Sequence, residues 1–387
     1  MQSDTETRQM CKKTTCVIRF SLVGLMLHVI PAAALGGGII GDDLKLLPGD
    51  GAAFDQFGYS IDIDGPRVAV GAIFGGTGGA AYVFDAATGT QTAELVPADG
   101  VSGDAFGTSI AIDGGFVAVG SPGHDASAGS VYIFDADTGA QIAELVAGDR
   151  VAGDNFGTSV AMAGGFVAVG APFDGDMGFF SGAVYVFETA TWTQVGKFVP
   201  ADGESGDRLG VSVAIDGGRI AAGAYLDDDA GNNTGAAYVF DAATAAQVSK
   251  LLPDDGATDD WFGTSVAIEN GVVAVGSYQD DDNGTDSGSV YLYDADTGAQ
   301  IAKLTAGDGI DFDQFGFTVA LDRSVVVVGT PGDDDNGPDS GSAYLFDAST
   351  GDPLGKLLPG DGTFNDFFAW AVAADNGRAA GGAVFDG

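Results

Sequence analysis

A short segment that returns at regular spacing constrains this chain more than any other feature. Each copy holds an Asp, any residue, an aromatic residue or Leu, and then Gly or Ala. The copies begin at Asp55, Asp104, Asp154, Asp207, Asp260, Asp313 and Asp366. They lie 49, 50 and then four times 53 residues apart in a chain of 387 residues. A period of about 50 residues is typical of propellers and solenoids, so one repeat array is expected rather than several unrelated domains.

Each repeat predicts four short antiparallel strands. In the fourth copy, alternating apolar residues indicate strands at 211–215, 219–223, 235–240 and 247–252. No helical periodicity of useful length appears. Four antiparallel strands per unit make one blade of a propeller. We therefore expect an all-β fold, a seven-bladed β-propeller of four-stranded antiparallel blades.

The two ends of the repeat array predict how the ring closes. The third-strand pattern does not return in the seventh repeat, whereas the fourth-strand pattern has an extra copy at residues 44–48. The amino-terminal strand would then complete the last blade and remove open sheet edges. The third strand of that blade would come from residues 38–40 or be missing, and a missing strand would leave room for strand addition by another chain.

Residues 1–34 do not belong to the repeat. Lys12 and Lys13 precede a mostly apolar run at 20–30, and small residues follow at 31–34. This pattern predicts a signal peptide at 1–34, followed by the propeller at 35–387; the alternative is an uncleaved amino-terminal anchor. Both cysteines, Cys11 and Cys16, lie in this leader, so the mature chain would have no disulfide. We expect a secreted protein, extracellular or at the cell surface, with no membrane insertion after leader removal.

The formal net charge is -40, and it excludes several partners. Nucleic acids and acidic membrane surfaces would be repelled. Most of the acid is Asp, which favours turns. Because strand direction alternates, the loops after the second strand and the connections between blades emerge on one face of the ring. That face is expected to be strongly acidic.

The loops after the second strand of repeats four to six are the best candidates for a metal. They combine adjacent carboxylates with Asn and Gly, which are suitable hard oxygen donors for calcium. The candidate ligands are Asp227, Asp229, Asp280, Asp282, Asp286, Asp333, Asp335 and Asp339. The alternative is a solvated acidic rim without metal. No other cofactor is expected.

No residue is assigned to catalysis. The repeated Asp occurs in all seven copies, so it is expected to cap backbone N–H groups before the first strand, and the Phe after it to wedge between blades. His124 is the only histidine after the leader, and a lone loop histidine is usually solvated. A single histidine without cysteine supplies a transition-metal site poorly. Trp192, Trp261 and Trp370 occupy unrelated positions of the repeat.

The motif has a known counterpart. Phe156-Gly157 is followed by Gly170-Ala171-Pro172, and Phe106-Gly107 by Gly120-Ser121-Pro122. This pattern resembles FG-GAP repeats, found in the propeller of integrin α subunits and in many secreted bacterial proteins, and it implies a seven-bladed propeller over roughly residues 43–387. Integrin-type repeats that bind calcium carry an Asp/Asn-rich loop between the first two strands. Here that connection is as short as residues 112–115, so calcium is not expected at the family's position.

These observations favour a binding module. We expect a secreted, calcium-stabilised propeller for extracellular recognition or adhesion, with a protein or glycan as ligand. One alternative is a non-catalytic structural or surface-layer component. The other is a glycan-acting enzyme with its site at the channel mouth, which would need a cluster of converging polar groups that does not repeat.

Overall fold

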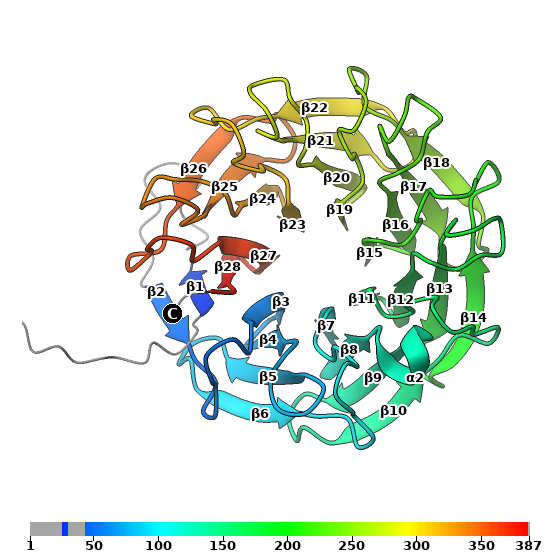
Figure 1. Ribbon diagram of the computed structural model, residues 1–387, viewed down its shortest axis with the longest axis vertical. Coiled ribbons are helices and arrows are strands. Elements are labelled where there is room, and N and C mark those ends of the chain that lie inside the picture. The colour runs from blue at the N-terminus through cyan, green and yellow to red at the C-terminus, as the bar shows by residue number, and fades with distance from the viewer. Residues whose placement is uncertain (1–24, 30–42, 386–387) are drawn as a thin grey trace, which may run out of the picture.

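The computed structural model describes residues 25–29 and 43–385, and its strands form blades around a central channel (Figure 1). The expected all-β propeller of four-stranded antiparallel blades is confirmed. The expectation of seven blades is not met in full, because only six blades consist of four consecutive strands. These strands are here called a to d from the channel outward. Blades one to three contain β3 (Phe57–Asp64), β4 (Arg67–Ala72), β5 (Ala80–Asp85), β6 (Gln91–Leu95); β7 (Ile110–Asp113), β8 (Phe116–Ser121), β9 (Ser130–Asp135), β10 (Gln141–Leu145); and β11 (Ser159–Ala163), β12 (Phe166–Ala171), β13 (Ala183–Glu188), β14 (Thr193–Phe198).

Blades four to six continue the ring in the same order. They contain β15 (Val213–Asp216), β16 (Arg219–Ala224), β17 (Ala236–Asp241), β18 (Gln247–Leu251); β19 (Ser265–Glu269), β20 (Val272–Ser277), β21 (Ser289–Asp294), β22 (Gln300–Leu304); and β23 (Thr318–Asp322), β24 (Val325–Thr330), β25 (Ser342–Asp347), β26 (Pro353–Leu357). Within the described residues, no helix is long and apolar enough to cross a membrane.

A composite sheet joins the two ends of the chain. Its order is β2 (Asp43–Leu46), β1 (Leu25–Val29), β28 (Arg378–Ala383) and β27 (Phe368–Asp375). The expected outer strand from the amino-terminal region is therefore present as β2. The third strand is β1, which pairs with β28 from Leu25↔Gly382 to Val29↔Arg378. The expectation that residues 38–40 supply this strand, or that it is missing, is wrong.

The origin of β1 bears on the predicted leader. This strand lies inside residues 1–34, whereas 1–24 and 30–34 lie outside the described residues. The composition of this segment resembles the apolar core of a signal peptide, but apolar residues of this kind also suit a β-strand. Leader cleavage therefore stays a prediction, and it would remove a strand of the composite sheet.

Burial follows strand position within each blade. Strands b and c are buried at five of their six residues, as in β16 and β17. Both of their faces are covered by neighbouring blades, so they read as continuous apolar runs. Strand d is more polar and only partly buried, as in β6, where one of five residues is fully buried. The core therefore consists of separate apolar layers between adjacent blades.

The repeated Phe joins one blade to the next, as expected. Phe106 is fully buried and packs with Ala81 and Val83 of blade one and with Val117 of blade two. Its ring meets Tyr132 and Phe134 edge to face, at centroid distances of 5.8 and 5.9 Å. Edge-to-face aromatic contacts add about 1 kcal/mol to the burial of the rings. Each such Phe is thus a wedge between blades.

The glycines of the repeat allow the blades to approach closely. A Cβ on Gly223 would lie 1.8 Å from the carbonyl oxygen of Gly263 in the next blade. That oxygen also accepts a hydrogen bond from Ser212 Oγ at 3.1 Å. Only Gly permits this contact of strand b with the neighbouring backbone.

The repeated Asp caps a turn in every copy. In each, the carboxylate accepts a hydrogen bond from the backbone N–H three residues earlier, as from Val151 to Asp154 at 2.7 Å. The other pairs are Ala52–Asp55, Val101–Asp104, Glu204–Asp207, Ala257–Asp260, Ile310–Asp313 and Thr363–Asp366. The capping role expected from the sequence is confirmed.

Candidate functional site

The loops between strands b and c and the connections between blades form one surface, here called the loop face. Each b–c loop bonds to the connection that enters the following blade. Phe312 N–H donates to Thr285 O at 2.7 Å, and Asn155 N–H donates to Ser127 O at 2.9 Å. These backbone hydrogen bonds hold the loops in fixed positions, so side chains on this face are preorganised.

Four blades carry the same charged cluster on this face, here called a lysine cage. In blade five, Lys303 Nζ donates to Asp255 at 2.9 Å, Asp280 at 3.0 Å and Asp282 at 2.5 Å. Tyr291 Oη donates to Asp280 at 2.7 Å. The equivalent lysines are Lys197 in blade three, Lys250 in blade four and Lys356 in blade six.

The cages account for the charge of these buried carboxylates. Asp280 is only 2% exposed, so it needs a cation nearby. Burial lowers the pKa of Lys303, but its three hydrogen-bonded carboxylates outweigh this and the net pKa is raised. Burial and the Asp280 charge raise the pKa of Tyr291, which keeps the phenol a donor. Each cage is therefore a neutral phenol and an ammonium surrounded by carboxylates.

The structure separates the eight candidate calcium ligands into two groups. Six of them are cage carboxylates, namely Asp227, Asp229, Asp280, Asp282, Asp333 and Asp335. Asp286 and Asp339 instead have positive φ, and their backbone N–H groups donate to Asp281 and Asp334. A lysine thus already provides a cation to the six, and the calcium prediction stays a prediction.

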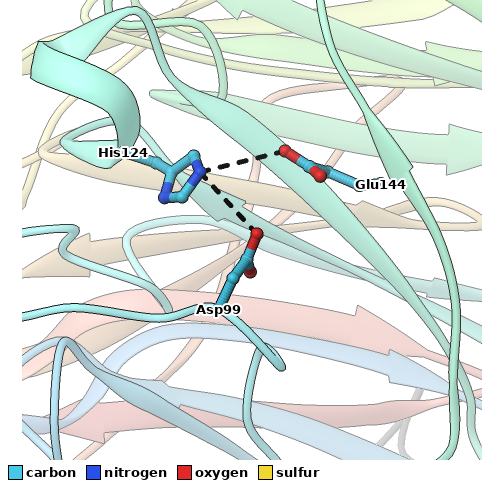
Figure 2. Close-up of side chains that lie close together, drawn as sticks. All are labelled: Asp99, His124 and Glu144. Atoms are coloured by element: carbon cyan, nitrogen blue, oxygen red, sulfur yellow. Dashed lines mark ion pairs between the residues drawn. The ribbon is translucent and has the colours of Figure 1, made fainter.

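Blade two departs from this pattern. Glu144 of β10 pairs with Tyr132 in the register that Lys197 has with Tyr185, so a carboxylate replaces the ammonium. His124, three residues after β8, takes the place of Asp174, which lies three residues after β12. The third member, Asp99, corresponds to Asp149. Figure 2 shows Asp99 and Glu144 together at the Nε2 end of the His124 ring, and one carboxylate oxygen of each lies 4.0 Å from Nε2.

A tight turn directs His124 inward. The segment α2 (His124–Ser127) has positive φ at Asp125 and Ala126, so it is a left-handed turn rather than a regular helix. His124 is 8% exposed, and its Nδ1 lies 3.1 Å from Asp104 Oδ2. The expectation of a solvated loop histidine is therefore wrong, because the capping carboxylate of the same blade anchors the ring.

A cleft opens beside Asp99, His124 and Glu144. Its volume is about 800 Å³, and its lining includes Asp99, Asp104, His124, Glu144 and Arg150. Arg150 Nη2 lies 2.9 Å from Asp125 Oδ2 at the edge of the cleft. Blade two thus combines a buried imidazole, four carboxylates, one guanidinium and solvent access.

An aromatic arc follows the inner edge of the loop face from blade four to blade one. Its members stand in contact in the order Tyr225, Trp261, Tyr278, Phe317, Trp370 and Tyr59, with ring centroids 4.7 to 6.1 Å apart. All are half-buried. They lie where strands a begin or strands b end, and strands a line the channel (Figure 1). The arc therefore borders the channel mouth.

Two features give the arc polar groups in addition to its packed rings. The indole Nε1 of Trp261 is buried and has no hydrogen-bond partner among the described residues. Arg208 extends the arc, because its guanidinium donates to Tyr225 Oη and lies 5.0 Å from the Phe173 ring centroid. The arc thus offers apolar ring surface together with polar groups.

The channel itself is lined mostly by Ala, Val and Ile of strands a, and it carries one notable acid. Asp62 stands where the other blades and β27 have Ala, for example Ala111 and Ala373. Its carboxylate accepts hydrogen bonds from Ile112 N–H at 2.8 Å and Ile63 N–H at 2.9 Å. Burial raises the pKa of Asp62 to about 7.

Comparison with known families identifies the repeat. Residues 41–84, 90–134, 140–187, 192–240, 245–293 and 299–346 match the FG-GAP repeat. The chain belongs to the FG-GAP repeat family. The resemblance expected from the sequence is therefore confirmed. Comparison with curated proteins gave no match.

The FG-GAP unit does not coincide with a blade. The segment 41–84 contains β2 and then β3, β4 and β5, so it supplies the outer strand of one sheet and three strands of the next. The other five units have the same offset. Six FG-GAP units thus overlap the six continuous blades and reach into the composite sheet.

Sequence reasoning missed the blade-two cluster and the arc of this FG-GAP protein. A signal for the first was present, because Glu94 and Glu144 occupy the strand-d position where other repeats have Lys. For the second, Trp261 precedes the repeated Phe by one residue and Trp370 follows it by two. Both positions lie at the start of strand a, which only the three-dimensional arrangement reveals.

Proposed function

We propose that this FG-GAP propeller is a secreted recognition module that binds an extracellular protein or glycan over the aromatic arc. The single observation that supports this is the continuous arc of half-buried rings at the channel mouth. Tyr and Trp are enriched in binding surfaces because they offer large apolar area and a polar group. A net charge of -40 favours neutral or basic ligands.

We further propose that the composite sheet acts as the seventh blade. Its order places β27 at the channel and β2 outermost, which matches strands a and d of the other blades. The contacts of β27 with β23 of blade six and with β3 of blade one support this proposal. A seven-membered ring closed by amino-terminal strands is the arrangement that the repeat pattern favours.

Calcium stabilisation and adhesion belong to the same proposal. Calcium would support the loop face if it bound the carboxylates of blades four to six in addition to their lysines. The measurement is the melting temperature with calcium and with chelator, and an unchanged value would remove calcium from the proposal. The recognition surface would remain, because no member of the arc is a candidate ligand.

The test of recognition uses variants of the arc. Wild-type protein is screened on glycan and extracellular-protein arrays, and each bound ligand is titrated against Trp370→Ala and Tyr278→Ala. We expect binding to weaken at least about tenfold, as for aromatic anchors in other interfaces. Trp192→Ala is the matched control, because Trp192 packs on Phe116, the first residue of β8 after the a–b turn of blade two, on the opposite face of the ring.

The outcomes distinguish the alternatives. Equal loss in the Trp192→Ala control would indicate damage to the fold rather than to a site. Binding that all variants retain would exclude the arc. Absence of any ligand on either array would favour the structural or surface-layer role, and ligand turnover would favour the glycan-acting enzyme. That the protein is not an enzyme remains a prediction.

A further inference from the structure

Blade two has Glu144 at the strand-d position where blades three to six have the lysine of the cage. In blade three, Lys197 Nζ lies within 2.8 Å of Asp149, Asp174 and Asp176. In blade two, Glu144 occupies the lysine position, and Asp99 and Glu144 both approach His124 Nε2, with no lysine of the described residues paired to either carboxylate. We propose that Asp99, His124 and Glu144 bind a divalent transition metal such as zinc. This proposal is independent of the aromatic arc.

The hydrogen bonds of the imidazole support metal binding. His124 Nδ1 is 3.1 Å from Asp104 Oδ2, and Asp104 is only 3% exposed. A carboxylate at this position fixes the proton on Nδ1 and leaves the Nε2 lone pair free, as in carboxylate–histidine–metal arrangements. Nε2 has no partner within hydrogen-bonding distance among the described residues, although the side chain is 90% buried. The Nε2 lone pair and the two carboxylates point at one region, where a bound cation would interact favourably with all three groups.

Each carboxylate is oriented by a neighbour of its own. Tyr132 Oη donates to Asp99 Oδ1 at 3.0 Å, which leaves Oδ2 directed at the imidazole. Ser130 Oγ donates to Glu144 Oε1 at 2.7 Å. All three ligand residues therefore have outer partners, as metal ligands in built sites do.

The spacing suits a small ion. The three ligand atoms lie within 4.8 Å of one another. Ligand atoms of a tetrahedral zinc at bond lengths of about 2.0–2.2 Å stand about 3.4 Å apart, so modest side-chain rotation would close the site. One imidazole with two carboxylates favours zinc or a similar transition metal over calcium, which takes six to eight oxygens. A fourth position would face the cleft, where water or a ligand group can enter.

The same geometry does not occur in blade one. Glu94 also replaces the lysine there, but Gly75 stands at the position of His124. Blade one is therefore a natural comparison with the same carboxylate and no imidazole. This difference provides a matched control within the same chain.

The experiment is titration of the purified full chain with Zn²⁺ by calorimetry, with Co²⁺ absorption as a second measurement. We expect one tight site per chain and a four-coordinate Co²⁺ spectrum. Glu144→Gln should weaken the site roughly 100-fold through loss of a ligand. His124→Asp with Glu144→Lys rebuilds the cage of blade three and should abolish the site while the melting temperature without metal is kept or raised.

The controls exclude binding by acidic surface alone. Glu94→Gln removes the same charge from blade one and should leave the tight site unchanged. Calcium and magnesium should bind at least about tenfold more weakly than zinc, because they use the imidazole poorly. The proposal is overturned if no site is tighter than the background of surface carboxylates, or if the tight site survives both Glu144→Gln and the rebuilt cage.

Discussion

The charge of a single lysine decides the stability of each cage. Replacement of Lys303 by Met keeps the aliphatic stem but leaves Asp255, Asp280 and Asp282 without their ammonium. Because Asp280 is buried, we expect a loss of about 2 kcal/mol in the free energy of unfolding, measured by urea denaturation. Calcium should recover part of this loss in the variant, because the same oxygens then lack a cation.

The control for this variant is Arg323→Met. Arg323 is 57% exposed and lies 3.9 Å from Asp322, so its removal changes the net charge equally without opening a cage. We expect a change below about 0.5 kcal/mol there. Equal losses for the two variants would show that net charge, not the cage, stabilises the loop.

Asp62, the acidic residue in the channel, should make the stability of the protein depend on pH. Burial raises the pKa of Asp62 to about 7 from an ordinary value of 3.8. Below the ordinary value both folded and unfolded chains hold the proton. Between the two values only the unfolded chain releases it, so stability falls as pH rises through this range and levels off above the folded pKa.

Asp62→Asn should remove this part of the pH dependence. The variant is expected to gain stability relative to wild type at pH 8 compared with pH 4, measured as free energy of unfolding in urea at both values. Asp207, Asp260 and Asp313, whose pKa values burial raises to about 6, keep their own pH dependence in both proteins. A difference between the two proteins that stays constant with pH would contradict the assignment.

At the scale of elements, close contact between blades depends on glycines of strand b. Gly223→Ala would place a methyl group 1.8 Å from the Gly263 carbonyl oxygen, so β16 must move away from blade five. We expect a loss of about 3 kcal/mol in unfolding free energy. Gly217→Ala has a φ of +54° and nothing within 4 Å, so it should lose only about 1 kcal/mol through backbone strain. Similar losses at both positions would contradict the contact.

The strands and the contacts between blades were predictable because the same residue pattern recurs along the sequence. The pattern of Asp154 and Phe156 returns in other blades, so alternation, turn residues and the capping role could be checked against each other. β1 could not be predicted this way. It departs from the repeat, and its apolar residues suit a leader and a β-strand equally.

The candidate site was less predictable because it consists of exceptions to the repeat. His124 and Glu144 lie 20 residues apart in the sequence and meet only when β8 and β10 belong to one sheet. A lone histidine supplied no reason to expect a metal until its neighbours were known. The candidate calcium loops were expected to bind metal or to be solvated, and the lysines that pair with their carboxylates were not anticipated, because those lysines lie on strand d, more than 20 residues further along the chain.

For the whole molecule, ring closure depends on β1 and β2. β1 pairs with β2 on one side and β28 on the other. A chain that begins at residue 35 would leave β28 and β2 with unpaired edges facing each other. We expect a lower melting temperature and self-association, measured by scanning calorimetry and light scattering, relative to a chain that lacks only residues 1–24.

A truncated chain that stays monomeric with an unchanged melting temperature would show that another strand replaces β1. If the protein is exported, as proposed, the intact mass of the exported form would identify its amino terminus. Export with residues 25–29 retained would favour the anchor over the cleaved leader. Export without them would mean that the mature ring closes differently from the ring described above.

The offset between the FG-GAP unit and the blade bears on how such rings change during evolution. Each unit starts with the outer strand of one sheet and ends with strand c of the next. It therefore contains residues from both sides of a contact between two adjacent sheets. Gene duplication of one whole unit therefore adds a blade whose partners on either side already fit. The number of blades is then limited by the curvature that the wedge-shaped layers permit, rather than by the invention of a new interface.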